Sequence, residues 1–155
     1  MNEETYCCCQ ALADLAVIPM GGNGLDALVF ASFKRIEEHG GDQWWLNIST
    51  CRVCGQDWMV AQDERIYDNF YLRRLTKEIK QDIVEWSLWP EEFLTYERVL
   101  KLGRATGRVW TFYDSGSPAL VTTAEDLRRE RPDISFEEIA YLLGISAPHA
   151  ASLLG

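Results

Sequence analysis

Two cysteines that lie close together in the sequence are the residues of this chain best suited to chemistry. Cys51 and Cys54 are separated by two residues and are followed by Gly55. Two thiolates at this spacing can fill two corners of a tetrahedral metal site, and a glycine after them allows the backbone to reverse direction. The spacing therefore predicts a metal-binding turn, and the ion needs two more ligands from elsewhere in the chain.

Few residues can supply those two ligands. The candidates are two histidines and a run of three cysteines near the N-terminus: His39, His149, Cys7, Cys8 and Cys9. A pair of thiols from the run would complete a four-thiolate site and close a chain loop of about 40 residues. We predict that Cys7 and Cys9 are the ligands and Cys8 the spare thiol, with Cys8 and Cys9 as the alternative pair. Because four thiolates leave no open position, we expect a structural Zn²⁺.

Three other uses of the cysteines compete with a metal site. A thioredoxin-like redox pair would stand at the start of a helix, whereas apolar runs typical of strands flank Cys51 and Cys54 on both sides. A secreted disulfide framework would follow a signal peptide, but residues 1–19 begin with acidic rather than basic residues. The third alternative, five unligated thiols in a reducing compartment, stays open.

Three segments around the cysteine pair have the composition of β-strands. They are residues 43–50, 57–62 and 66–75, and the second of them places Trp58 and Val60 on one face. Together they predict a three-stranded antiparallel sheet with the cysteines at its first turn. This arrangement resembles a zinc ribbon, which implies that the metal stabilises the sheet and takes no part in a reaction.

The rest of the sequence predicts mainly helices. Residues 25–39 carry apolar side chains at helical spacing, including Leu28 and Ile36, and residues 10–18 form either a short helix or a first strand. Further helices are expected to begin at Thr76, Pro90, Ser135 and Ser146. Another helix is expected over residues 122–131, where Thr122 and Glu125 have the spacing of a capping box. One more strand is expected over residues 109–113.

The predicted fold is α+β in a single domain over residues 1–155, with a zinc-ribbon-like sheet at 43–75 and a mainly helical part at 76–155. With 155 residues, 47% of them hydrophobic, the chain is long enough to bury one core. No apolar run approaches the ~20 residues that span a bilayer. We therefore expect a soluble, cytoplasmic protein with no membrane partner.

The charge balance bears on the kind of partner. The chain has 24 acidic and 15 basic residues, a formal net charge of -9. Proteins that bind nucleic acid draw much of their affinity from lysines and arginines that neutralise phosphates, so this balance argues against such a partner. It favours a basic protein partner, although many soluble proteins are acidic for solubility alone.

The C-terminal segment contains a second resemblance. Residues 133–154 are similar to the helix-turn-helix of sigma factors and related bacterial regulators, with Ile139 and Ala140 in the first helix, Gly144 at the turn and Ser146 before the second helix. A DNA reader presents Arg, Lys, Asn or Gln from that second helix, and here only His149 could contact a base. We interpret the segment as a helical hairpin that packs on the body or binds a protein.

No catalytic constellation can be assembled from the sequence, so we expect no enzymatic activity. The two histidines form no Ser-His-Asp or HExxH motif, and the glycines of residues 21–24 lack the Lys-Ser/Thr of a phosphate-binding loop. Adjacent carboxylates such as Asp63 and Glu64 are typical of solvated turns.

In size, acidity and lack of catalytic motifs, the chain resembles bacterial immunity proteins, which are small cytoplasmic inhibitors of toxins. The resemblance is one of kind and carries no residues with it. It implies direct binding to a basic toxin domain; the alternative is a transcription-associated regulator that uses the C-terminal hairpin. For the toxin interface we expect an aromatic centre among acidic residues. The residues proposed for it are Asp57, Trp58, Asp63, Glu64, Tyr67 and Asp68.

Overall fold

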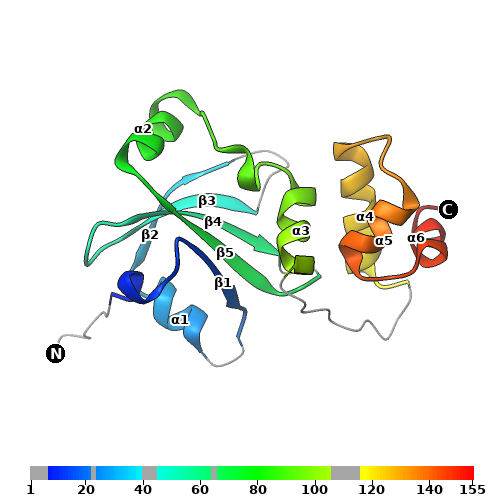
Figure 1. Cartoon of the computed structure of the whole chain (residues 1–155), viewed down its shortest axis with the longest axis horizontal. Helices are drawn as coiled ribbons and strands as arrows, with labels where there is room; N and C mark the ends of the chain where they lie inside the picture. Colours follow the sequence, from blue (N-terminus) through cyan, green and yellow to red (C-terminus); the bar gives the residue numbers. More distant parts are fainter. Residues whose placement is uncertain (1–6, 22–23, 40–44, 64–65, 106–115) are drawn as a thin grey trace. The chain divides into compact units, whose positions relative to one another are not determined.

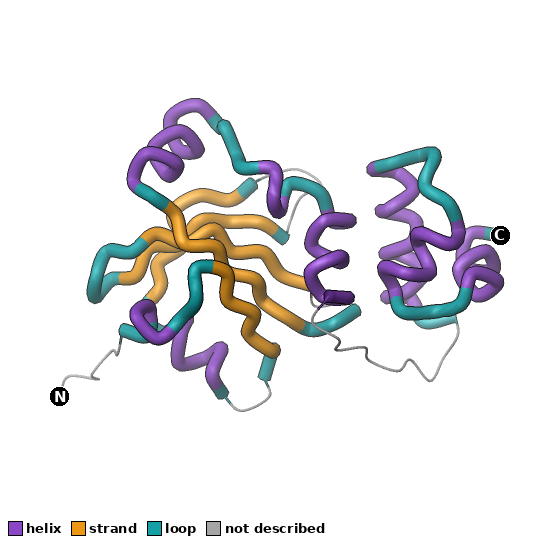
Figure 2. The backbone as a smooth tube through the Cα atoms, viewed as in Figure 1, coloured by secondary structure: helices purple, strands orange, loops and turns teal. Residues whose placement is uncertain are grey.

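A computed structural model describes residues 7–21, 24–39, 45–63, 66–105 and 116–155. These residues belong to two compact units. The first unit comprises the described residues of Met1–Gln62 and Asn69–Leu94, and the second those of Asp63–Asp68 and Thr95–Gly155. Strands occur in the first unit and most of the helical residues in the second (Figures 1 and 2). This content confirms the predicted α+β class.

The first unit is built on an antiparallel sheet of five strands, not the three predicted. Strands β3, β4 and β5 match the predicted segments, and two more strands extend the sheet to the order β1-β5-β4-β3-β2. The strands are β1 Leu15–Pro19, β2 Phe33–Glu38, β3 Leu46–Cys51, β4 Asp57–Asp63 and β5 Asn69–Leu75. The sheet therefore begins well before residue 43. The segment of residues 10–18, for which a short helix and a strand were the alternatives, holds the end of the 3-10 helix η1 Cys9–Ala11 and most of β1.

The prediction of one helix over residues 25–39 is wrong. A short helix, α1 Leu25–Phe30, ends at Ala31, and the chain then enters β2. Strand β2 pairs with β3 from Phe33 opposite Cys51 to Glu38 opposite Asn47. Hydrogen bonds to β3 therefore satisfy the backbone N–H and C=O groups of β2 and stabilise it as a strand. The helical spacing of its side chains could not predict this pairing.

One face of the sheet forms the main hydrophobic core of the first unit. Ile18 of β1, Trp58 of β4 and Leu72 of β5 are buried there. Cys9 of η1 and Val29 of α1 pack into the same cluster. The N-terminal segment and α1 therefore cover this face, and the burial of the N-terminal segment brings the early cysteines to the sheet.

The opposite face of the sheet is buried as well. Ile48, Met59 and Tyr71 alternate along their strands with residues of the first face, and all three are inaccessible to solvent. Helix α2 Lys77–Trp86 follows β5; its N-cap Thr76 accepts a hydrogen bond from the Ile79 N–H, as predicted, and its Ile83 is buried. In Figure 1, α1 and α2 lie on opposite sides of the sheet.

The second unit packs helices around the residues that join β4 to β5. The Tyr67 hydroxyl donates to the Leu142 carbonyl at 2.5 Å, and the Tyr96 hydroxyl lies 3.3 Å from Asp63 Oδ1. The unit's helices are α3 Tyr96–Ala105, α4 Pro118–Glu130, α5 Phe136–Leu143 and α6 Ala147–Leu154. Pro90 precedes only a short 3-10 helix, η2 Glu91–Phe93, and α3 begins later than predicted.

Local signals set the ends of α5 and the start of α6. Ser135 and Glu138 form the predicted capping box, and Gly144 ends α5 with φ of +70°, a conformation that favours glycine. Ser146 caps α6 as expected. Helix α4 differs: it begins at Pro118, so Thr122 lies inside the helix and starts no capping box. The strand predicted over residues 109–113 lies outside the described residues.

The described part of residues 76–155 is helical, as predicted for that half of the chain. Within the described ranges, no helix is both long and apolar enough to cross a membrane.

Candidate metal centre

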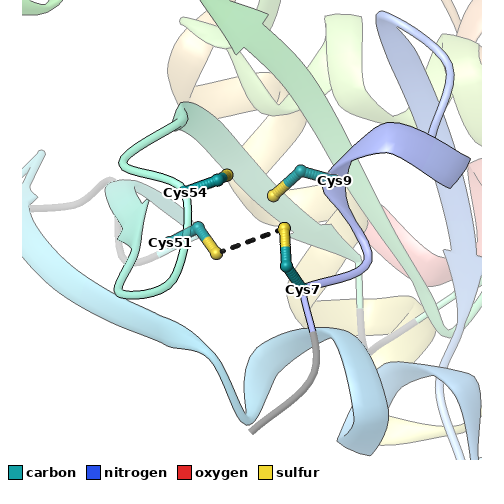
Figure 3. A group of neighbouring side chains, drawn as sticks. All are labelled: Cys7, Cys9, Cys51 and Cys54. Carbon is teal, nitrogen blue, oxygen red and sulfur yellow. Dashed lines mark hydrogen bonds between the residues drawn. The ribbon is translucent and has the colours of Figure 1, made fainter.

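The turn between β3 and β4 has the backbone geometry that two metal-binding thiolates need. Cys51 is the last residue of β3, and its N–H donates to the Gln56 carbonyl at 2.9 Å. The Gly55 N–H donates back to the Cys51 carbonyl at 2.9 Å. Gly55 has φ of +77°, which side-chain-bearing residues rarely adopt, so glycine is required for this reversal. The turn presents Cys51 and Cys54 toward the same point (Figure 3).

The structure brings together the four cysteines that the sequence analysis selected. The Sγ atoms of Cys7, Cys9, Cys51 and Cys54 all lie within 4.8 Å of one another, and those of Cys7 and Cys51 are 3.8 Å apart. Zinc–thiolate bonds of about 2.3 Å in a tetrahedron place sulfur atoms about 3.8 Å apart. The cluster shown in Figure 3 is therefore compatible with a structural metal ion. Cys8 is half-buried and does not belong to the cluster.

The two buried thiols of the cluster, Cys51 and Cys9, have different electrostatic surroundings. Burial alone would raise the pKa of Cys51, but the Ser32 hydroxyl, 3.4 Å away, and the backbone N–H groups of Cys54 and Val53 outweigh it and lower the pKa to about 6. Burial raises the pKa of Cys9 above its ordinary value even though the Trp58 side chain lowers it. A metal ion would thus meet one readily ionised thiol and would have to displace the proton of another.

The neighbours of Cys9 fix its position from two sides. The Trp58 indole donates from Nε1 to Cys9 Sγ at 3.3 Å, and the Arg74 guanidinium lies over the Trp58 ring, 4.5 Å from its centre. Arg74 Nη2 also donates to the backbone carbonyls of Cys9 at 2.8 Å and Leu12 at 3.0 Å. Arg74 therefore links the N-terminal segment to β5, and such outer contacts orient metal ligands.

A buried carboxylate links the cysteine turn to α2. Lys77 Nζ donates to the Gly55 carbonyl at 2.8 Å and to Asp57 Oδ2 at 2.8 Å, and Lys80 Nζ lies 3.1 Å from Asp57 Oδ1. Burial would raise the pKa of Asp57, but hydrogen bonds from Lys77, Thr50 and Lys80 outweigh it and hold the pKa below its ordinary value. Asp57 is thus a structural residue of the turn.

The expected toxin interface is wrong for most of its residues. Asp57, Trp58 and Asp63 lie in β4, and Tyr67 lies in the connection between β4 and β5, which we call the hairpin end. All four are buried. Asp68 is half-buried, and Glu64 lies outside the described residues. Other parts of the first unit cover both faces of the sheet. Side chains that alternate between the two faces of a strand are therefore buried on either face, and no face is left for a partner. These side chains support the fold.

The histidines take no part in the cluster. The His39 ring packs against Trp89, with ring centres 5.0 Å apart, and the His149 N–H donates to the Ser146 hydroxyl at the start of α6. Four thiolates among the described residues suffice for a complete site. The supporting residues Ser32, Arg74 and Lys77 were not predicted, because no sequence spacing relates them to the cysteines.

Comparisons with known proteins did not identify a family for this chain. Neither family models, nor curated protein sequences, nor solved structures gave a match to the chain. The function is therefore argued from the residues and their arrangement.

Proposed function

We propose that this chain is a binding protein of the immunity type, which holds a structural Zn²⁺ and neutralises a bacterial toxin by direct contact. The arrangement of four thiolates carries the first part of the proposal. Cys7, Cys9, Cys51 and Cys54 would occupy all four positions around the ion, so no position would remain for a substrate or a reactive water. The ion would then stabilise the protein rather than act in catalysis.

Zinc is the metal best suited to this site because it has no redox chemistry and favours tetrahedral thiolate ligands. Elemental analysis of the purified chain should find about one zinc per chain. Thiol titration should show four protected cysteines that become reactive when a chelator is added, with Cys8 reactive throughout. Iron in place of zinc, or five thiols that react equally without a chelator, would overturn the assignment.

Exposed apolar side chains near α2 support a role in protein binding. Trp86 at the end of α2 is 69% exposed and Leu88 just after it is 62% exposed, while Ile79 and Val84 are also exposed. Ile79 and Leu88 line a groove together with Trp89. Large exposed aromatic and aliphatic groups of this kind commonly form the centre of a protein interface.

The charges beside these residues favour a basic partner. Glu78, Asp82 and Glu85 are exposed on α2, whereas its two lysines, Lys77 and Lys80, are paired with the buried Asp57. The helix therefore presents carboxylates around an apolar centre, and a cationic toxin surface would be complementary to it. This surface replaces the interface expected from residues 57–68.

Co-expression tests the immunity role directly. Immunity genes typically lie beside the genes of their toxins, so the product of the neighbouring gene is the toxin to test. Wild-type chain should restore growth of cells that produce it, and the two purified proteins should form a complex that salt weakens. Trp86→Ala should weaken that complex about thirtyfold. Leu28→Ala, which changes an exposed apolar residue of α1, is the matched control and should bind like wild type. Failure of the wild-type chain to protect or bind would overturn the proposal.

The helix-turn-helix-like pair α5 and α6 supports a second candidate, a role in transcription. The capping box at Ser135, the turn at Gly144 and the cap at Ser146 give this pair well-defined ends. Helix α6 carries no lysine or arginine, and residues 117–155 have six acidic and three basic residues, which favours a protein such as polymerase over DNA. Duplex binding with a steep inverse dependence on salt would favour the DNA form of this candidate.

A further inference from the structure

The sheet of the first unit has a pocket that the proposed function does not use. It has a volume of about 410 Å³, within the range of small-molecule sites. Its floor lies on the sheet face that also forms the core, over strands β2, β3 and β4, and its walls come from α1, β2 and β5. The lining residues are Phe30, Phe33, Arg35, Asn47, Ser49, Val60, Gln62 and Phe70.

Three phenylalanines give the pocket aromatic walls. The ring of Phe30 is 4.6 Å from that of Phe70 and 5.5 Å from that of Phe33, both edge-to-face. Val60 adds a buried aliphatic surface to the floor. Aromatic faces and edges of this kind pack well against a flat ring.

The floor is polar, whereas the core cluster beside it on this sheet face is apolar. Asn47 lies opposite Val60, and Ser49 lies opposite Trp58 and Arg35 on the neighbouring strands. Asn47 and Ser49 are both buried. Polar side chains in such a position are costly unless they form hydrogen bonds, and these two bond to each other.

The hydrogen bond between these two residues orients the Asn47 amide. Ser49 Oγ donates to Asn47 Oδ1 at 2.9 Å, so the amide offers its Nδ2 group as a donor to a ligand. Gln62 follows Val60 by two positions on β4, so it lies on the same face and diagonally across from Asn47. Its amide adds a donor and an acceptor to the floor.

The pocket has no acidic residue among its described lining residues, and its one cation is paired. Among the described residues that line it, Arg35 alone is charged, and its Nη1 is 2.7 Å from Glu38 Oε1. The chain as a whole has a net charge of -9, which disfavours the approach of phosphates. The pocket therefore suits an uncharged ligand.

We propose that this pocket binds a nucleobase, presented as the free base or as a nucleoside. A nucleobase is flat, which suits the phenylalanine walls, and it carries adjacent donors and acceptors on its edge. Asn and Gln amides pair with such edges through two hydrogen bonds. The proposal does not depend on the immunity role.

Titration of the full-length protein with adenosine, guanosine, cytidine and uridine tests the proposal. At least one nucleoside should bind saturably by calorimetry, and it should shift the NMR signals of the Asn47 and Gln62 side-chain amides. Gln62→Leu should weaken that binding about tenfold, because the pairing of one amide with a base is lost. Gln81→Leu, at an exposed position of α2, is the matched control and should leave the affinity unchanged.

A second variant covers the case in which Gln62→Leu does not fold. Asn47→Asp keeps the shape of the side chain but replaces the Nδ2 donor by an acceptor, so it should weaken the same nucleoside. Binding of none of the four nucleosides would overturn the proposal. So would binding that neither variant changes, or binding of indole alone, since indole lacks the edge that the amides recognise.

Discussion

Replacement of Cys54 by serine separates a metal ligand from an ordinary thiol. Cys54 is exposed, and loss of an exposed side chain without a special role changes the free energy of unfolding by less than about 0.5 kcal/mol. As a ligand, however, Cys54 helps to cross-link the segment around Cys9 to the β3–β4 turn. A cross-link over about 40 residues stabilises a fold by about 4 kcal/mol through the entropy of the unfolded chain. We expect Cys54→Ser to lose about half of this or more.

Urea unfolding measures this loss, followed by tryptophan fluorescence in buffer with zinc. Cys8→Ser is the matched control, because Cys8 lies beside two of the ligands and outside the cluster. A chelator should reduce the stability of the wild type and of Cys8→Ser, and should have little effect on Cys54→Ser. If the two variants unfold at the same urea concentration and contain the same amount of metal, the assignment of the cluster as a metal centre is wrong.

Three further predictions concern buried groups. Burial raises the pKa of Asp63 from 3.8 to about 7, so the folded state holds a proton that the unfolded state releases; stability should fall as pH rises from 4 to 7. Urea unfolding of Asp63→Asn should lack this decline, and equal slopes for both proteins would contradict it. The pKa of Asp57 is lowered, so Asp57→Asn should cost about 2 kcal/mol at neutral pH, with the difference shrinking below pH ~4. A difference that acid titration leaves constant would exclude its ion pairs as the cause. Trp58→Phe removes the N–H donor to Cys9 and should weaken zinc about tenfold in competition with a chelator. Trp45→Phe, which removes an indole bond to the Phe93 carbonyl, should leave zinc affinity unchanged, and equal weakening would refute the orienting role.

Several local signals in the sequence predicted helix starts correctly, although the equally local Thr122 and Glu125 signal lies inside α4. The capping box of Ser135 and Glu138 and the caps at Thr76 and Ser146 lie where expected, because each needs only three or four consecutive residues. Strand β2 was missed because its hydrogen-bond partners lie in β3. Its apolar Ile36 matched a helical pattern with Leu28, yet both side chains are exposed.

The cysteine cluster was predictable from one local spacing and from the small number of other possible ligands, whereas its surroundings were not predictable. The spacing of Cys51, Cys54 and Gly55 specifies a turn, and the early cysteines were the obvious complement. Ser32 and Arg74 reach the cluster only because the sheet brings β5 and the segment before β2 to it. The mistaken toxin interface arose because sequence alternation does not reveal that both faces of a sheet are covered.

The hairpin end between β4 and β5 makes the second unit discontinuous along the chain. Asp63 and Tyr67 contribute to the helical core that residues 95–155 complete. The C-terminal helices are therefore not a module that could be added to, or removed from, an existing sheet protein by joining two genes end to end. A fragment beginning at residue 95 would lack Tyr67. Its helices should fold only when a separate peptide that contains the hairpin end is added.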